Sequence, residues 1–186
     1  MIVKVCIFIS NRMANKSLNS AWPSRPCSDL SRCVPLGQVN SALSKKMIIE
    51  EVKENELNDL LAIFNAAKSS ATVFKNIDTD IEEFSKEIDG EKLFVAKCNN
   101  NIVGFLSIWE QENFIHHLYI TPEYQNQGIG SALLQECKRK YGFPLTLKCI
   151  KENKRACAFY VRNGWTEKSL AEGPEGLYIE FQLENA

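Results

Sequence analysis

A glycine-containing segment in the middle of the chain has the composition of an anion-binding turn. It reads Gln125-Asn-Gln-Gly-Ile-Gly130 and lies between a predicted strand and a predicted helix. Gly128 and Gly130 have no Cβ atom, so a ligand can approach their backbone closely. The first amides of a helix have no intrahelical partner, and the helix dipole favours negative charge there. The segment therefore predicts a cradle for a pyrophosphate group, the alternative being a plain glycine-rich turn before a helix.

Two better-known phosphate motifs do not match this segment. A Walker loop requires Lys and then Ser or Thr after its last glycine, whereas Ser131 and Ala132 follow Gly130. The dinucleotide fingerprint requires a third glycine at the position of Leu133. The segment therefore belongs to neither class of nucleotide-binding loop.

The chain contains two histidines, His116 and His117. A histidine with an ordinary pKa of about 6.5 can take up a proton at neutral pH. Both lie in a predicted strand, where neighbouring side chains point to opposite faces, so they are not expected to hold one metal ion together. No histidine stands at metal-ligand spacing from a cysteine, and the sequence predicts no metal site. Each histidine is interpreted either as a catalytic base or as a sheet residue paired with a neighbour.

The periodicity of apolar residues predicts the elements that hold these side chains. An amphipathic helix is expected over 54–68, and a second one after the capping segment Asp78-Thr-Asp80. Further helices are expected over 128–141 and over 154–162, the latter ended by Asn163-Gly164. Strands are expected at 47–52, 93–98, 102–109, 114–120, 145–150, 165–170 and 177–183. The order β-α-α-β-β-β-α-β-α-β-β predicts an α/β (α+β) domain with a mixed sheet.

The composition limits the classes of partner. The net charge of −1 over 186 residues provides no field that would draw the chain onto nucleic acid or an anionic membrane. The number of cysteines is odd, at seven, and no Cys-x-x-Cys occurs, which is atypical of a secreted disulfide framework. We therefore expect reduced thiols, a cytoplasmic location, and no nucleic-acid or membrane partner.

The composition changes near residue 46. Residues 10–46 are rich in Ser, Asn, Pro and Arg and have no apolar period. Residues 1–46 are therefore expected to be a disordered arm, or to precede a natural start at Met47. The patterned domain is expected to span residues 47–186.

Two separated motifs resemble those of one enzyme family. The segment 119–134 is similar to the acetyl-CoA-binding motif of the GNAT family of N-acetyltransferases, whose core is Arg/Gln-x-x-Gly-x-Gly/Ala. The residues Asn153-Lys-Arg-Ala156, Phe159-Tyr160 and Asn163-Gly164-Trp165 resemble the Asn-x-x-Ala, Phe-Tyr and Gly-Phe block of that family. The resemblance implies a mostly antiparallel, twisted sheet of about seven strands with four helices. It also implies transfer of an acetyl group from acetyl-CoA to a primary amine, by direct attack in a ternary complex.

The resemblance implies which residues bind acetyl-CoA. The backbone of the strand 114–120 would bind the pantetheine arm and the thioester carbonyl, and this strand would splay from the strand 145–150 to admit them. The amides of residues 125–131 would bind the pyrophosphate. The cofactor contacts implied in this way are Leu118, Tyr119, Ile120, Gln125, Asn126, Gln127, Gly128, Ile129, Gly130, Ser131, Asn153, Ala156 and Tyr160.

Tyr160 corresponds to the general acid of the family. A phenol with a pKa of about 10 is protonated at neutral pH and can give its proton to a departing thiolate. From composition alone, the alternative is an aromatic residue packed at the end of a helix.

The general base is less well defined. Lys148 stands where some family members have a glutamate, which is a departure from the pattern. His116 has the parity of Leu118 and Ile120 and resembles the catalytic histidine of some members, and His117 is a weaker alternative. Two glutamates at the end of the preceding strand, and a water chain to solvent, remain open as the base; the glutamates are Glu110 and Glu112.

A second departure concerns the cradle. Asn126 and Gln127 stand where many members carry Arg or Lys, so phosphate binding is expected to rely on backbone amides. The amine acceptor is unknown, and the chain is expected to be a monomer or a homodimer. The alternative to an enzyme is a non-catalytic acyl-CoA-binding sensor or scaffold on the same fold.

Overall fold

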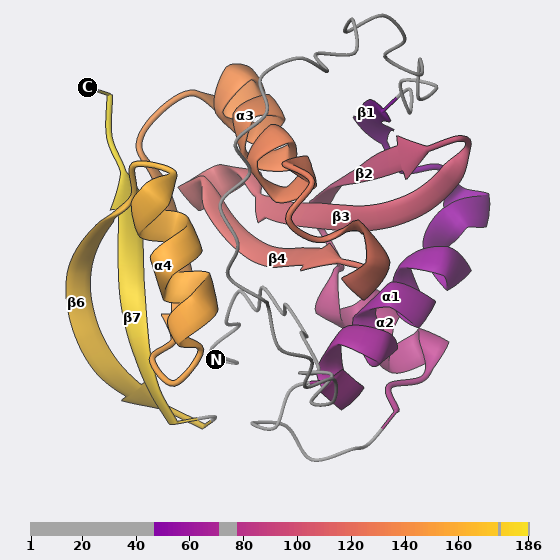
Figure 1. Ribbon diagram of the computed structural model, residues 1–186. Helices are drawn as coiled ribbons and strands as arrows, with labels where there is room; N and C mark the ends of the chain where they lie inside the picture. Colours follow the sequence, from indigo (N-terminus) through magenta and orange to yellow (C-terminus); the bar gives the residue numbers. More distant parts are fainter. Residues whose placement is uncertain (1–46, 71–77, 175, 186) are drawn as a thin grey trace, which may run out of the picture.

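The computed structural model describes residues 47–70, 78–174 and 176–185 (Figure 1). The predictions made for residues 1–46 lie outside these described residues. The strands are β1 Met47–Glu51, β2 Lys92–Cys98, β3 Asn101–Trp109, β4 Phe114–Ile120, β5 Leu145–Ile150, β6 Thr166–Gly173 and β7 Gly176–Leu183. The helices are α1 Leu57–Ser70, α2 Ile81–Glu87, α3 Ile129–Tyr141 and α4 Lys154–Arg162.

The strands form one seven-stranded sheet in the order β1-β2-β3-β4-β5-β7-β6. The pairing of β4 with β5 is parallel, and the other neighbouring strands are antiparallel. This arrangement confirms the predicted fold and element order. The predicted bounds of β4, β5 and α4 are also those of the structure.

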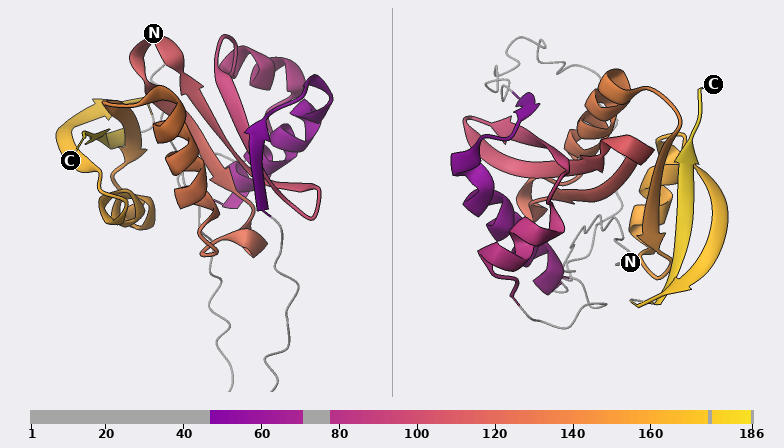
Figure 2. Two further views of the ribbon diagram at one scale, coloured as in Figure 1. Left: turned by 90° about the horizontal axis from the view of Figure 1, so that it is seen from above. Right: turned by 180° about the vertical axis from the view of Figure 1, so that it is seen from behind.

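The helices cover the two faces of the sheet (Figure 2). The buried side chains of α3 and α4 belong to one apolar cluster, whereas those of α1 and α2 belong to a second cluster. Leu133, Leu134 and Cys137 form the buried stripe of α3, as their spacing predicts. The two helix pairs therefore approach the sheet from opposite sides, with β4 contributing to both clusters.

Local signals fix where several elements begin and end. The Asp80 side chain accepts a hydrogen bond from the Glu83 amide and caps α2, as expected from the Asp78-Thr-Asp80 segment. Asn99 and Asn100 have positive φ in the tight turn between β2 and β3, a conformation that asparagine tolerates. Asn153 caps α4 by accepting from the Ala156 amide at 3.1 Å. These caps place the helices that line the site described below.

The strands β4 and β5 pair over a very short length. Their register contains two pairs, Phe114 with Thr146 and Ile115 with Leu147. Beyond Ile115 the two strands separate, which is the divergence that the family resemblance implied. The remaining length of β4, from His116 to Ile120, therefore lies along an opening in the sheet.

The strand β4 also contains a bulge. In its register with β3, Ile108 pairs with Ile115 and Ser107 pairs with His117, so His116 is an extra residue on β4. The bulged residue, His116, directly follows Ile115, the last residue of β4 that pairs with β5. The backbone irregularity of β4 therefore begins where the sheet opens.

In the described part of the chain, no helix has the length and apolar content needed to cross a membrane. The four cysteines of that part are buried free thiols: Cys98, Cys137, Cys149 and Cys157.

Candidate functional site

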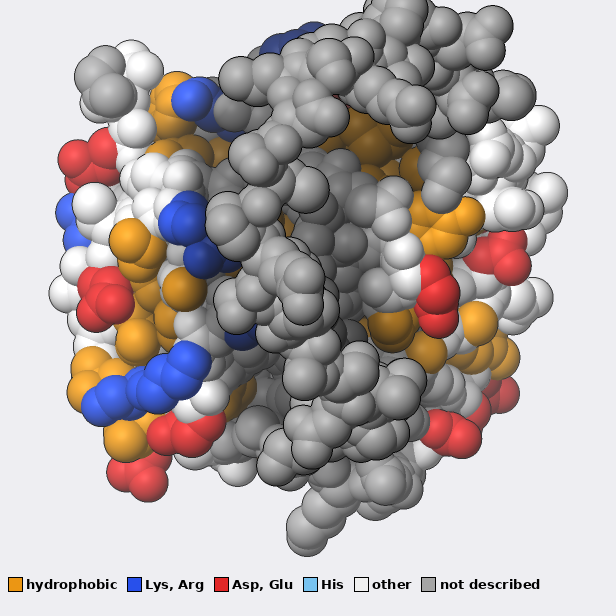
Figure 3. All heavy atoms as spheres, viewed as in Figure 1, with side chains coloured by type: hydrophobic (Ala, Val, Ile, Leu, Met, Phe, Trp, Pro, Cys, Tyr) orange, Lys and Arg blue, Asp and Glu red, His pale blue; other side chains and the backbone are white. Residues whose placement is uncertain are grey.

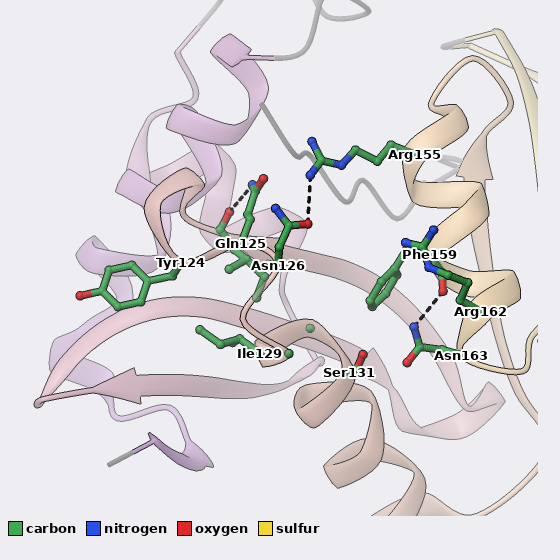
Figure 4. Close-up of a pocket in the computed structure, with 12 residues that line it drawn as sticks. Tyr124, Gln125, Asn126, Ile129, Ser131, Arg155, Phe159, Arg162 and Asn163 are labelled. Atoms are coloured by element: carbon green, nitrogen blue, oxygen red, sulfur yellow. Dashed lines mark hydrogen bonds between the residues drawn. The ribbon is translucent and has the colours of Figure 1, made fainter. Parts of the chain in front are cut away.

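A pocket of about 400 Å³ lies between the start of α3 and one face of α4. Its walls come from the end of β4, the turn that follows, the first turn of α3 and the facing side of α4 (Figure 4). The lining residues are Ile120, Tyr124, Gln125, Asn126, Gly128, Ile129, Gly130, Ser131, Arg155, Phe159, Arg162 and Asn163. Seven of these twelve residues are cofactor contacts predicted from the sequence. Gln127, which was also predicted, does not line the pocket.

The floor of the pocket is the amino end of α3. Gly128 is the N-cap with φ of 82°, a conformation that costs glycine little, and no side chain caps the helix. The Ala132 amide makes the first helical bond, to the Gly128 carbonyl at 3.0 Å. The amides of Ile129, Gly130 and Ser131 therefore precede the hydrogen-bonded ladder, as the first amides of a helix do. The positive end of the helix dipole adds to this preference for an anion.

The side chains of the turn hold its shape. Gln125 is buried and donates from Nε2 to the Ile120 carbonyl at 2.9 Å, which ties the turn to the end of β4. Gln127 donates to the Glu123 carbonyl at 2.8 Å and is thereby occupied within the turn. Asn126 has positive φ and presents its Oδ1 atom to α4. The turn is thus fixed before any ligand enters.

Two arginines on α4 form the opposite wall. Arg155 and Arg162 both line the pocket, and Arg155 donates to Asn126 Oδ1 at 3.0 Å (Figure 4). The helix has no acidic residue, and basic side chains gather over it on the surface (Figure 3). Guanidinium groups therefore face the amides on which the predicted phosphate binding relies, and they are further candidates for contacts with a phosphate. The seven-residue spacing of the two arginines places both on one helix face, but it does not specify that this face lies opposite the cradle.

Several of the other predicted contacts lie in the core rather than in the pocket lining. Leu118, Tyr119 and Ala156 are buried, and the Tyr119 ring packs edge-on against Phe64 at 5.5 Å. Asn153 caps α4 with its side-chain oxygen. These residues position the walls, and Leu118 and Tyr119 also lie on the part of β4 that runs along the opening.

Tyr160 is fully buried, with an exposed fraction of 0%. Its ring packs against Trp165 at 5.9 Å and Phe181 at 5.7 Å between ring centroids. Its neighbour Phe159, rather than Tyr160, lines the pocket. Tyr160 therefore belongs to the apolar cluster beneath α4, beside the pocket.

The two histidines lie at the inner end of the opening, next to Glu91. The Nδ1 atom of His116 contacts Glu91 Oε1, and the Nδ1 atom of His117 lies 3.5 Å from Glu91 Oε2. Ser107 Oγ lies 2.8 Å from His117 Nδ1. The expectation that the two rings point to opposite faces was wrong, because the bulge at His116 breaks the alternation of the strand.

The pKa of His117 is raised above its ordinary value. Complete burial is the largest influence and disfavours the charged ring, but the hydrogen bonds and charges of Glu87 and Glu91 together outweigh it. Glu87 Oε2 lies 3.6 Å from His117 Nε2. The cluster therefore brings two carboxylates to the buried ring of His117, and they favour its protonated form.

The other candidate bases have different surroundings. Lys148 on β5 lies over the rings of Phe114 and Tyr178, at 5.5 and 5.1 Å, and provides a cation where some family members have a carboxylate. Glu110 is 4.0 Å from Lys92 on the rim of the sheet. In the described ranges, no group of three or more His, Cys, Asp or Glu residues has an arrangement that could hold a metal ion.

Comparison with known sequences identifies the family. A sequence model described as the acetyltransferase (GNAT) family matches residues 57–165, which includes the strand, the turn and both helices of the site. The chain belongs to the GNAT family of acetyltransferases. An uncharacterised N-acetyltransferase of Methanocaldococcus jannaschii is 26% identical over 163 residues, covering 78% of this chain and 72% of that protein.

Solved structures share the fold of this GNAT protein. An N-acetyltransferase from Rhodopseudomonas palustris superposes with a TM-score of 0.63 at 17% identity, covering 74% of this chain and 95% of that one. An acetyltransferase from Bacillus anthracis, solved in complex with acetyl coenzyme A, superposes with a TM-score of 0.58 at 16% identity, covering 75% of this chain and 100% of that one. These similarities show the fold.

Proposed function

We propose that this GNAT protein transfers the acetyl group of acetyl-CoA to a primary amine by direct attack in a ternary complex. The observation that supports it most strongly is the pocket between α3 and α4, where the unbonded amides of Ile129 to Ser131 face two arginines. Helix-start amides and guanidinium groups are the donors that phosphates prefer. The donor set therefore fits the pyrophosphate of coenzyme A.

The opening between β4 and β5 suits the remainder of the cofactor. Ile120 lines the pocket, and the opening runs back along β4 to His116. Four residues of extended strand span about 13 Å, which gives an elongated arm a path from the pocket to the histidines. Acetyl-CoA supplies a thioester when bound. The backbone of Leu118 to Ile120 would orient the arm, and the walls of the opening would exclude water.

Proton transfers would be made by side chains at the inner end of the opening. A base must take a proton from the amine as the C–N bond forms, and an acid can protonate the thiolate as the C–S bond breaks. We assign the base to His116, with His117 as the weaker alternative because its pKa is raised. We assign the acid to Tyr160. Because Tyr160 belongs to the apolar cluster beneath α4, the thiolate would have to enter this cluster to take the proton.

One observation favours a second function, a non-catalytic sensor or scaffold that binds acyl-CoA. Tyr160 is fully buried and does not line the pocket, so the phosphate cradle is formed without the predicted general acid. A sensor would bind acetyl-CoA at the same place and release no thiol in the presence of amines.

The test is a panel of amines with detection of free coenzyme A thiol. The panel covers protein N-termini, lysines, polyamines, aminoglycosides and amino acids, and thermal stabilisation by acetyl-CoA is measured on the same samples. Amine-dependent thiol release together with stabilisation supports the enzyme, and stabilisation alone supports the sensor. If neither occurs, the proposal of acetyl-CoA binding is contradicted.

Gly128→Trp is the decisive variant because no atom lies within 4 Å of the Cβ position at Gly128, so the indole would extend into open space at the cradle. Gly142→Trp is the matched control. Gly142 also has positive φ and open space around its Cβ position, but it lies at the opposite end of α3. We expect Gly128→Trp, but not Gly142→Trp, to abolish both amine-dependent thiol release and stabilisation by acetyl-CoA.

We further propose a cytoplasmic location for the protein, where the free thiols of the described residues would stay reduced. The amine panel would identify the acceptor. A measurement of mass in solution would distinguish a monomer from a homodimer.

A further inference from the structure

A buried carboxylate contacts the predicted base. The Glu91 side chain has an exposed fraction of 0% and lies directly before β2, where its amide donates to the Ile88 carbonyl at 3.0 Å. Its Oε1 atom contacts Nδ1 of His116, whose side chain is 17% exposed. A carboxylate is rarely buried completely unless it is paired, so this contact accounts for part of its position.

The placement of His116 is unusual in two respects. It is the extra residue of the bulge in β4, so it has no partner opposite it on β3. It also directly follows the last residue of β4 that pairs with β5. His116 therefore lies where β4 has just separated from β5, at the inner end of the opening that leads to the pocket.

The chemistry of this contact selects one form of the ring. A neutral imidazole carries one N–H group and one lone pair, and a carboxylate only accepts hydrogen bonds. The proton of His116 must therefore reside on Nδ1 to satisfy Glu91, which leaves the lone pair on Nε2. We infer that Glu91 is a positioning residue that fixes His116 in this tautomer, so that Nε2 takes the proton from the acceptor amine.

This inference rests on the proposed function, and its step balances. The amine nitrogen forms a bond to the acetyl carbon and gives its proton to Nε2 of His116. The C–S bond breaks, and the thiolate takes a proton from Tyr160 or from solvent. Glu91 keeps its hydrogen bond throughout and stabilises the imidazolium that forms, as the carboxylate partner of a catalytic histidine does in general.

The second histidine also lies beside Glu91. The groups that face Glu91 are His116 and His117 from β4, and those that face His117 are Glu87 from α2 and Ser107 from β3. The carboxylates of Glu87 and Glu91 raise the pKa of His117 against the effect of its burial, which favours the protonated ring. When protonated, His117 would offset part of the charge of these carboxylates.

The presence of two histidines in the whole chain allows a direct test by nitrogen-15 NMR of the imidazole rings in the full-length protein. His116→Gln and His117→Gln assign the two sets of signals. At pH 8, we expect His116 of the unaltered protein to carry its proton on Nδ1 and to show an unprotonated Nε2. A ring protonated on Nε2 alone would overturn the inference, and this result needs no substrate and no variant at Glu91.

Glu91→Gln tests the dependence of the tautomer on the carboxylate. We expect this isosteric change to mix the two tautomers of His116, whereas Glu87→Gln should leave them unchanged, because Glu87 contacts His117 instead. If Glu91→Gln leaves the His116 signals as they were, Glu91 does not position the ring.

Turnover of an amine from the panel separates a positioning role from a purely structural one. We expect Glu91→Gln to lower kcat at least 10-fold and to leave KM for acetyl-CoA unchanged. It should also shift the part of the kcat–pH profile in which kcat increases with pH. His116→Gln should lower kcat by about 100-fold. Stabilisation by acetyl-CoA should persist in both variants. If acetyl-CoA does not stabilise even the unaltered protein, the proposed function itself is refuted. Unchanged kcat in Glu91→Gln would contradict the inference while leaving the proposed function intact.

Discussion

Arg155 on α4 donates a hydrogen bond from its guanidinium to Asn126 Oδ1, 3.0 Å away in the turn before α3. This contact joins the two walls of the pocket, one made of backbone amides and the other of basic side chains. It also fixes the guanidinium near the start of α3. The relationship makes the arginines of α4 part of the proposed phosphate site.

The first prediction concerns these arginines. Arg155→Ala or Arg162→Ala should each weaken coenzyme A binding about 10-fold, which is ~1.4 kcal/mol and near the lower end for a hydrogen bond from a charged group at a solvent-accessible site. Isothermal titration measures the affinity. Lys154→Ala is the matched control, because Lys154 lies on the same helix but outside the pocket lining. Equal effects of all three changes would indicate general charge attraction rather than specific contacts.

The second prediction concerns Tyr160. Tyr160→Phe should lower kcat by about 100-fold if its hydroxyl protonates the thiolate. The ring contacts with Trp165 and Phe181 are kept in this variant, so acetyl-CoA affinity should change little, and the melting temperature should fall only by the cost of losing the buried hydroxyl. Steady-state kinetics and thermal unfolding measure both. Unaltered turnover would make Tyr160 a packing residue and remove it from the mechanism.

The third prediction concerns the close approach of β3 to β4. A Cβ atom on Gly104 would lie 2.4 Å from Ile120 Cδ1 and 2.6 Å from the Tyr119 carbonyl oxygen. Gly104→Ala should therefore push β4 outward, lower the free energy of unfolding by about 1–3 kcal/mol and weaken acetyl-CoA binding, since Ile120 lines the pocket. Urea unfolding provides the measurement.

The same site offers an internal control. Adding Ile120→Val to Gly104→Ala removes the Cδ1 atom but leaves the carbonyl oxygen, so the double variant should recover part of the lost stability. No recovery would show that the clash with the side chain is not the cause.

The fourth prediction is a dependence of stability on pH. The pKa of His117 is higher in the folded protein than the ordinary value of about 6.5. A group with a raised folded pKa binds its proton more tightly when folded, so its stabilisation is complete below pH 6.5 and is lost as the pH rises through the folded pKa. The free energy of unfolding should therefore fall between about pH 6.5 and the folded pKa. Denaturant unfolding across pH 6–9 tests this, and the fall should be smaller in His117→Gln.

Much of this site was predictable because its signals are local. The glycines at 128 and 130 mark a helix start, and the spacing of apolar residues marks the strand before it and the helix itself. Asn153 and Asn163 likewise mark the ends of α4 by their capping chemistry. Each of these features depends on residues within a few positions of one another, which is the range over which periodicity and capping act.

The features that were missed depend on tertiary contacts. Glu91 and His116 are 25 positions apart, and their contact depends on how the segment between α2 and β2 lies against β4. The bulge at His116 arises from the register with β3 and leaves no distinct mark in the sequence of β4. Arg155 faces the cradle because of the angle between α3 and α4, which no spacing within either helix specifies.

The most direct test of the central claim is a crystal structure of the protein with acetyl-CoA. The account predicts that the pyrophosphate oxygens accept hydrogen bonds from the amides between Gly128 and Ser131, that Arg155 or Arg162 contacts a phosphate, and that the thioester lies along β4 near His116. Coenzyme A bound elsewhere, with the pocket between α3 and α4 empty, would contradict it.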